Sequence, residues 1–334
     1  MASVLIIGGT RFLGRAIAIE AVRRGHAVSA VNRGLSGPAP DGVESLRADR
    51  ADAGQLARAV AGRHWDTVID TCGFVPSEVG ATAEVLRSHA DHYIYVSAVD
   101  AMRAWPQEAV DETAAAWNCA ADAGDEGGTY SVLKAGCERA VRSRFAGKVT
   151  VVRPGVIVGP WENIGRLPWW LRRLARGGPV LVPARDTPLQ LIDSRDLAAF
   201  IVARHETPAA DLYNAVGPSG PTLRGMIELC ASDASPAAAE LVEASDEFLR
   251  GHAVDPWWEL PMWTPSWSRW YAACSVSDAR ATADGLSCRP LAATVRDTWA
   301  WLRERPEFKL RPKIGMSAER EQSLLAALSA ETTL

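Results

Sequence analysis

The sequence has 334 residues, of which 48% are hydrophobic, with a formal net charge of −4 and a pI of about 5.9. This length is more than one domain usually needs, so we expect one large domain with a smaller partner. The acidic balance, without a block of Lys and Arg, excludes a typical nucleic-acid binder, and no run approaches the roughly 18 apolar residues that span a bilayer.

Cysteines and histidines give no sign of a metal centre. The six cysteines are scattered without a CxxC pair, and the six histidines form neither an HExxH motif nor a ligand cluster. Reduced thiols in a cytosol are the simplest interpretation. The N-terminus MASVLIIGG lacks the basic region and cleavage site of a signal peptide. We therefore expect a cytoplasmic protein without a metal, membrane or nucleic-acid partner.

Short apolar runs alternate with amphipathic stretches through the first half of the chain. We expect strands at 3–7, 27–32, 45–48, 67–71, 93–97 and 149–153, and helices at 12–24, 55–61, 78–88 and 130–144. Such alternation indicates parallel βαβ units with right-handed crossovers. We predict the α/β class, with a Rossmann-type, doubly wound parallel sheet that binds ligands at the carboxyl ends of its strands.

The rest of the chain is more irregular. Residues 105–128 are polar and acidic, which predicts a long surface loop, and repeated prolines from 154 to 188 indicate the start of a smaller lobe. We predict a dinucleotide-binding domain of residues 1–155 plus about 189–220, and a C-terminal substrate lobe of about 156–188 plus 221–304. Residues 305–334 are expected to form a tail with a helix at 317–329, for which Ser317 is the N-cap.

A glycine-rich turn follows the first predicted strand and precedes the first helix. A pyrophosphate that meets backbone N–H groups at a helix N-terminus needs glycines for conformation and clearance. The turn therefore predicts a nicotinamide dinucleotide site. Its candidate contacts are Gly8, Thr10, Arg11, Phe12, Leu13 and Gly14. Arg11 stands where regular spacing would place a glycine, and it is either a phosphate-binding cation or a solvated arginine.

The end of the second predicted strand bears on the choice of cofactor. NAD enzymes usually place an acid there for the ribose 2′-OH, but this chain has Asn32, then Arg33, with Ser36 nearby. Arg33 could pair with a 2′-phosphate, which favours NADP over NAD. Asp49 either contacts the adenine region or only starts a turn. Further candidate cofactor contacts, at or after predicted strand ends, are Arg50, Cys72, Gly73, Pro154 and Val156.

Tyr130 and Lys134 are four residues apart on a predicted helix, which puts them on one face. A free tyrosine has a pKa near 10, and an adjacent ammonium lowers it by stabilising the phenolate. Tyr130 could then exchange a proton with an alcohol or carbonyl, and Lys134 could also hold the nicotinamide ribose. The pair by itself is common by chance.

The order of several motifs makes the pattern specific. The chain reads Gly8-Gly9-Thr10-Arg11-Phe12-Leu13-Gly14, then Tyr130-x-x-x-Lys134 with Glu138, Arg153-Pro154-Gly155 with Gly159-Pro160, Gln190-x-Ile192-Asp193, Tyr213-Asn214-Ala215 and Arg289-Pro290-Leu291. Over roughly residues 3 to 304 it resembles the extended short-chain dehydrogenase/reductase family, in its NAD-dependent epimerase/dehydratase group and GGTRF-type subgroup. The motifs are specific for the family and much less so for the reaction.

The resemblance implies a third catalytic group, a Ser or Thr at the end of the strand near residue 97. The best register puts this position at Ala98, with Ser97 one place before it. Because adjacent strand side chains point to opposite faces, either the strand end twists so that Ser97 serves, or Asp100 or a water replaces the hydroxyl. Ser97 is the candidate we favour. The acidic pair Asp111-Glu112 is expected at the edge of the site.

Tryptophans are concentrated in the predicted lobe, together with one arginine that aligns with family arginines near a nucleotide phosphate. The aromatic rings form either a wall over a substrate or the core of a loop-rich lobe, and the arginine is either a phosphate contact or a surface residue. These residues are Trp161, Trp169, Trp170, Trp257, Trp258, Trp263, Trp267, Trp270 and Arg289.

Three functions compete. The first is an NAD(P)-dependent reductase or dehydrogenase of a small-molecule carbonyl or alcohol, with Tyr130, Lys134 and Ser97 as its catalytic residues and a homodimer as the candidate assembly. The second is a nucleotide-sugar epimerase or dehydratase that retains NAD. The third is a non-catalytic RNA-binding relative, because the Gly-Gly-Thr-Arg-Phe turn also resembles chloroplast stem-loop-binding members of the family. The intact Tyr130/Lys134 pair and the acidic charge argue against the third.

Overall fold

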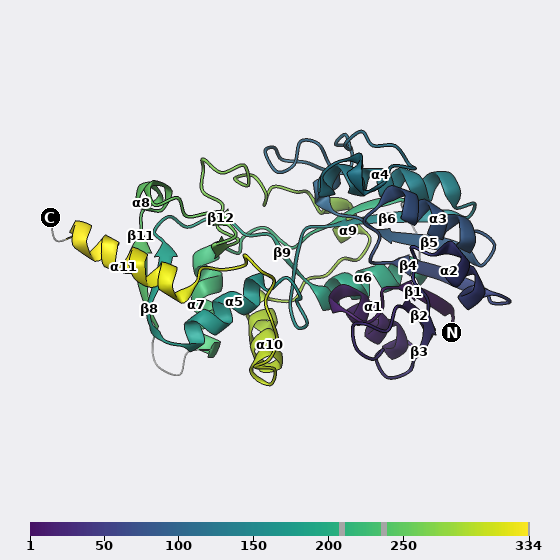
Figure 1. Ribbon diagram of the computed structural model, residues 1–334, viewed down its shortest axis with the longest axis horizontal. Coiled ribbons are helices and arrows are strands. Elements are labelled where there is room, and N and C mark those ends of the chain that lie inside the picture. Colours follow the sequence, from purple (N-terminus) through teal and green to yellow (C-terminus); the bar gives the residue numbers. More distant parts are fainter. Residues whose placement is uncertain (207–210, 235–238, 333–334) are drawn as a thin grey trace. The chain divides into compact units, whose positions relative to one another are not determined.

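The computed structural model describes residues 1–206, 211–234 and 239–332 (Figure 1). The chain divides into two compact units, which we describe separately. Unit 1 comprises Met1–Val156, Ser194–Gly217 and Val276–Cys288. Unit 2 comprises Ile157–Asp193, Pro218–Ser275 and Arg289–Leu334.

Unit 1 is built on a parallel sheet. Among the described residues its strands are β1 (Ser3–Ile7), β2 (Ala27–Asn32), β3 (Val43–Arg47), β4 (Trp65–Asp70), β5 (Ala90–Val96), β6 (Lys148–Pro154) and β10 (Leu212–Ala215). They are hydrogen-bonded in the order β10-β6-β5-β4-β1-β2-β3, and each pairing is parallel. The predicted doubly wound α/β sheet is confirmed. Its order reverses between β1 and β4, the switch point where such sheets bind ligands.

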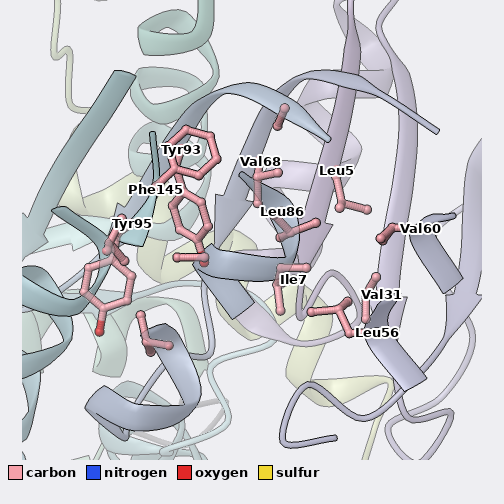
Figure 2. Packing of buried hydrophobic residues seen from close by; sticks show 14 of the residues in the cluster. Leu5, Ile7, Val31, Leu56, Val60, Val68, Leu86, Tyr93, Tyr95 and Phe145 are labelled. Carbon is pink, nitrogen blue, oxygen red and sulfur yellow. The ribbon is translucent and has the colours of Figure 1, made fainter. Parts of the chain in front are cut away.

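Helices cover both faces of this sheet (Figure 1). The helices of unit 1 are α1 (Phe12–Arg23), α2 (Ala53–Val60), α3 (Pro76–Leu86), α4 (Tyr130–Arg144), α6 (Ser194–Glu206) and the short α9 (Ala279–Ala283). α1 packs against α6, whereas α3 packs against both α2 and α4. Figure 2 shows the core between the sheet and α2 and α3, in which Leu5 and Ile7 meet Leu56, Val60 and Leu86. Burial on both faces explains why β1 is a continuous apolar run.

Element bounds agree with the sequence where the periodicity is clear. β1, β2 and α4 begin and end at the predicted residues. The third strand begins at Val43 and ends at Arg47, instead of running from 45 to 48, because its ladder with β2 starts where Val43 lies opposite Val28. Pairing with a neighbouring strand sets this boundary, and a weak local pattern could not show it.

The loop of residues 105–128 contains one regular element, the 3₁₀ turn η2 (Asp125–Gly127). It is not wholly on the surface, because Trp105, Val110 and Cys119 are buried. Val110 forms a β-bridge with Val276. Residues 276–288, predicted in the substrate lobe, therefore pack in unit 1, where Asp284 also accepts a hydrogen bond from the Tyr213 hydroxyl at 2.6 Å.

Unit 2 consists of helices and short strand pairs. Its helices are α5 (Arg166–Ala175), α7 (Leu223–Ala234), α8 (Asp246–Gly251), α10 (Leu291–Arg303) and α11 (Ala318–Thr332). The two-stranded sheets pair β7 (Val156–Val158) with β9 (Leu191–Asp193), β8 (Gly178–Pro183) with β11 (Ala239–Ala244), and β12 (Pro256–Trp257) with β13 (Leu260–Pro261). In the part of the chain that the structure describes, no helix is long and apolar enough to cross a membrane.

Half of the ten tryptophans of unit 2 are buried in its core. Trp170 and Trp263 are fully buried, and Trp257 is buried and stacks on Trp270 with ring centroids 5.0 Å apart. Trp258 and Trp267 remain partly exposed. The buried rings therefore form core, since rings of this size supply much of the apolar area of a loop-rich unit. For Trp161, Trp258 and Trp267, which are exposed, an aromatic wall stays a prediction.

The C-terminal helix α11 is anchored to unit 2. The Ser317 hydroxyl accepts a hydrogen bond from Arg320 N at 3.2 Å, which confirms the predicted N-cap. Glu321 pairs with Arg173 and accepts a hydrogen bond from Leu181 N at 3.1 Å. The predicted tail is therefore part of unit 2.

A buried histidine in the sheet makes stability depend on pH. His92 of β5 is buried, hydrogen-bonds Thr150 Oγ1 at 2.9 Å, and has its pKa lowered from 6.5 to about 4 by burial. The unfolded chain binds the proton more readily, so the free energy of unfolding should fall as the pH drops below 6.5. The expected loss is about 3 kcal/mol by pH 4.

Urea unfolding between pH 7 and pH 4 measures this loss. In His92→Gln, the decrease in the free energy of unfolding from pH 7 to pH 4 should be smaller by about 3 kcal/mol than in the parent protein. In the control His64→Gln, which changes a side chain that is 54% exposed, the decrease should equal that of the parent protein. Equal pH dependence in the parent protein and His92→Gln would contradict the prediction.

Candidate active site

The glycine turn brings the start of α1 against the end of β1. Gly8 has a φ of +95°, a conformation that glycine adopts without strain. Gly14 lies so close to Gly8 that a Cβ on it would be 2.1 Å from the Gly8 carbonyl oxygen. This close approach lets the helix N-terminus present backbone N–H groups to an anion, so the turn fits the pyrophosphate of a dinucleotide.

The other predicted residues of the turn differ in burial. Thr10 and Leu13 are buried, and Phe12 is partly buried with a φ of +35°. Arg11 is exposed immediately before α1, and its side chain makes no capping hydrogen bond. This position suits both a phosphate-binding cation and a solvated arginine.

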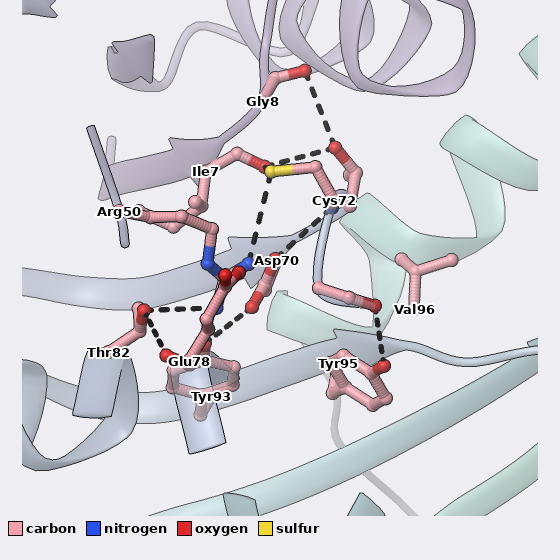
Figure 3. A network of polar contacts seen from close by, with 12 residues as sticks. Ile7, Gly8, Arg50, Asp70, Cys72, Glu78, Thr82, Tyr93, Tyr95 and Val96 are labelled. Carbon is pink, nitrogen blue, oxygen red and sulfur yellow. Dashed lines mark hydrogen bonds and ion pairs between the residues drawn. The ribbon is translucent and has the colours of Figure 1, made fainter. Parts of the chain in front are cut away.

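The end of β4 supports the glycine turn from the other side of the switch point (Figure 3). Thr71 Oγ1 donates to the carbonyl oxygen of Ile7 at 3.0 Å, and Cys72 Sγ lies 3.5 Å from the same oxygen. Burial raises the pKa of the Cys72 thiol. Thr71 is not among the residues predicted from the sequence, although its position directly after a strand next to β1 is a usable signal.

Arg50 is part of a buried network beneath the turn (Figure 3). Its guanidinium donates to Asp70 Oδ1 at 2.7 Å and to Thr82 Oγ1 at 3.0 Å. Asp70 is fully buried and also accepts from the Tyr93 hydroxyl at 2.8 Å. Arg50 thus has a structural role, because the charge of Asp70 has to be compensated inside the protein, and its contact with the cofactor stays a prediction.

The predicted cofactor-choice residues lie together at the ends of β2 and β3. Asn32 accepts a hydrogen bond from Gly34 N at 3.0 Å and donates to Ser45 Oγ at 3.0 Å, so its amide holds the strand end in place. Arg33 is 63% exposed and lies 3.8 Å from the carboxylate of Asp49, while Ser36 is exposed nearby. An exposed pair at this distance is weak, so Arg33 can exchange Asp49 for a ligand phosphate at little cost.

The side chain of Lys134, a residue of α4, places its buried ammonium group at the ends of β4 and β5. It donates to the carbonyl oxygen of Gly73 at 2.9 Å, to that of Val96 at 2.8 Å and to the Tyr95 hydroxyl at 2.7 Å. Burial lowers its pKa from 10.5 to about 8. All three ammonium protons have acceptors, so contact with a ribose hydroxyl requires one of these hydrogen bonds to be shared or exchanged.

Tyr130 is the first residue of α4 and is 49% exposed. Its ring lies 6.4 Å from the ring of Phe74, which follows Gly73 after β4. α4 thus carries an accessible phenol at its first residue and the buried ammonium of Lys134 one turn later.

The hydroxyl of Ser97 donates its proton to a side chain of α4. The side chain is buried and donates to Glu138 Oε1 at 2.6 Å. Glu138 in turn forms a buried bidentate pair with Arg153, with N···O distances of 2.8 and 2.7 Å. This hydrogen bond ties Ser97 to the buried Glu138–Arg153 pair, and its predicted catalytic role stays a prediction.

The other residues predicted from the sequence belong to β6 and the segment after it, to the loop of residues 105–128, and to unit 2. Pro154 is buried at the end of β6, and Val156 is partly buried just beyond it. Glu112 accepts a hydrogen bond from Asn214 N at 2.9 Å, which ties the loop to β10. Arg289 belongs to unit 2, where it lies 3.6 Å from Asp193. Within the described ranges, no group of three or more His, Cys, Asp and Glu side chains is arranged to hold a metal ion.

Comparison with known proteins gives matches in sequence and in fold. Residues 4–216 match the model of the NAD dependent epimerase/dehydratase family. The enzyme WbmH of Bordetella bronchiseptica, solved in complex with NAD+, is 16% identical with a TM-score of 0.68, over 91% of this chain and 99% of that chain. UDP-glucose 4-epimerase of Thermotoga maritima, solved with UDP-glucose, is 14% identical with a TM-score of 0.68, over the same two shares.

A curated relative is more similar in sequence. The chloroplast stem-loop binding protein of 41 kDa b from Arabidopsis thaliana is 27% identical over 245 residues. The match covers 68% of this chain and 62% of that protein, so it spans less than two thirds of the relative's length.

Proposed function

The chain belongs to the NAD-dependent epimerase/dehydratase family, and on this premise we propose that it is an NAD(P)-dependent oxidoreductase of a small-molecule carbonyl or alcohol. The observation that carries the proposal is the placement of α4. Its first residue, Tyr130, is accessible, and one turn later the ammonium of Lys134 is fixed at the ends of β4 and β5. The switch point with the glycine turn lies at the adjacent strand, β1.

The proposed roles follow from these positions. The backbone of the Gly8–Gly14 turn holds the dinucleotide pyrophosphate, and Lys134 lies where the nicotinamide ribose is expected. When bound, the cofactor supplies hydride-transfer chemistry. Tyr130 exchanges the proton at the substrate oxygen, and the positive charge of Lys134, four residues later on the same helix, is proposed to favour the phenolate form that this exchange requires. With Ser97 turned to Glu138, Tyr130 is the proposed proton donor by itself.

Cofactor turnover tests the proposal. The purified protein is first examined by native mass spectrometry for a retained cofactor, and NADPH oxidation is then followed with a panel of carbonyl compounds. Release of the cofactor and turnover with added NADPH are expected. A tightly retained NAD, with conversion of a nucleotide sugar and no need for added cofactor, would instead establish the epimerase or dehydratase alternative.

RNA binding is a second candidate function. The observation that favours it is the 27% identity to a protein named for stem-loop binding. The net charge of −4 opposes it, because affinity for RNA rests largely on neutralising phosphates. Salt-sensitive binding of a stem-loop RNA by the parent protein, together with no redox activity, would favour this candidate over the oxidoreductase.

Arg33 is proposed to set a preference for NADP. In Arg33→Asp, the ratio of the dissociation constants for NADP and NAD should move toward NAD by about tenfold or more, since a charge-assisted pair with the 2′-phosphate is lost and a repulsive charge is added. Fluorescence titration with both dinucleotides measures the ratio. Arg87→Asp makes the same change of charge at a side chain that is 51% exposed just after α3, and it serves as the control. An unaltered ratio in Arg33→Asp would remove Arg33 from cofactor selection.

A further inference from the structure

The ammonium of Lys134 has one side-chain acceptor besides its two backbone acceptors. The carbonyl groups of Gly73 and Val96 belong to the backbone at the ends of β4 and β5. The third acceptor is the hydroxyl of Tyr95, at 2.7 Å. Lys134 is 3% exposed and Tyr95 is fully buried, so this hydrogen bond is made away from bulk water.

The hydroxyl of Tyr95 is oriented to accept. Its own proton is donated to the carbonyl oxygen of Gly73 at 2.9 Å, which leaves an oxygen lone pair for Lys134. The Tyr95 ring also faces the ammonium, with Nζ 4.5 Å from the ring centroid, a distance at which a cation is attracted to the π-face. One side chain thus supplies both a lone pair and an aromatic face to the same charge.

We propose that Tyr95 is a positioning residue that keeps the ammonium of Lys134 charged and fixed between β4 and β5. The catalytic purpose of this arrangement rests on the proposed function, whereas the arrangement itself does not. Burial disfavours the charged form of Lys134, and its pKa of about 8 leaves little margin above neutral pH. Loss of the Tyr95 hydroxyl as an acceptor in this buried site would destabilise the charged form of Lys134 further.

The titratable and charged groups around Lys134 are Cys137 and Glu138 of α4, Asp70 of β4, Arg50 after β3, and Tyr95 itself.

Tyr95→Phe tests the proposal because it removes the hydroxyl and keeps the ring. The chain has four lysines, Lys134, Lys148, Lys309 and Lys313, so an NMR titration of full-length protein labelled with ¹³C at lysine Cε can resolve Lys134, with Lys134→Met to assign its signal. The pKa of Lys134 should be about 1 lower in Tyr95→Phe than in the parent protein, equivalent to a tenfold easier loss of the proton.

Tyr93→Phe is the matched control. Tyr93 lies two residues earlier on β5, is fully buried, and donates its hydroxyl proton to Asp70 instead of contacting Lys134. Both variants lose a buried hydroxyl and should lose similar stability in urea unfolding, but only Tyr95→Phe should lower the pKa of Lys134. An unchanged pKa in Tyr95→Phe, or an equal decrease in both variants, would overturn the proposal.

The same variants separate this inference from the proposed function. If the parent protein turns over NADPH, the alkaline limb of its kcat profile should move to lower pH in Tyr95→Phe and stay in place in Tyr93→Phe. A lowered pKa of Lys134 in a protein that has no redox activity would sustain the positioning role and reject the proposed oxidoreductase. Turnover of NADPH by the parent protein, with an unchanged pKa of Lys134 in Tyr95→Phe, would reject the positioning role and sustain the proposed oxidoreductase.

Discussion

Tyr130→Phe should lower kcat by about 10²- to 10⁴-fold, the usual contribution of a positioned proton donor, while the dissociation constant for the dinucleotide stays within about twofold of the parent value. The substitution removes the only group on this side chain that can exchange a proton. Tyr130 is 49% exposed at the start of α4, so little packing is lost and folding should be unaffected.

Steady-state kinetics with a substrate found in the NADPH screen, together with cofactor titration, measures both quantities. Tyr271→Phe is the matched control, since Tyr271 is 53% exposed and belongs to unit 2. A Tyr130→Phe enzyme that keeps more than half of the parental kcat would remove Tyr130 from the mechanism. A large loss in Tyr271→Phe as well would indicate a general effect of the substitution.

Gly14→Ala should disrupt the glycine turn. The added Cβ would lie 2.1 Å from the backbone oxygen of Gly8 and 2.9 Å from Thr71 Oγ1. A backbone atom cannot move aside as a flexible side chain can, so α1 must shift away from β1. We expect the free energy of unfolding to fall by about 3 kcal/mol, at the upper end of overpacking effects, and the affinity for the dinucleotide to fall by about 100-fold or more, since the helix N-terminus is displaced from the pyrophosphate.

Denaturant unfolding and cofactor titration of the variant give these two values. Gly251→Ala is the control, because a Cβ at this helical position of α8 meets nothing within 4 Å. Parental cofactor affinity in a folded Gly14→Ala protein would contradict the assignment of the turn to the pyrophosphate, even if its stability were reduced.

Much of the fold of unit 1 could be predicted because its signals are local. β1 is a continuous apolar run followed by glycines, and α4 shows a helical repeat from Tyr130 to Arg144, so both elements were predicted with the observed bounds. The third strand, whose sequence pattern is weak, begins two residues earlier than predicted, because the pairing of Val43 with Val28 decides where it begins. Residues 276–288 were assigned to the other lobe because their packing in unit 1 depends on Val110 and Tyr213, which are distant in sequence.

By itself, the sequence determined the glycine turn, the order of strands and helices, the Tyr130/Lys134 spacing and the resemblance to the family, since each is a local pattern. Only the tertiary structure decided which partners the polar side chains have. Arg50 is held by Asp70, Ser97 by Glu138, and Lys134 by Tyr95. In each pair the two residues are at least 20 positions apart. A buried polar or charged group is stable only with a hydrogen-bond or ion-pair partner, which the fold brings within reach from a distant part of the sequence. No local sequence pattern specifies which residue that partner is.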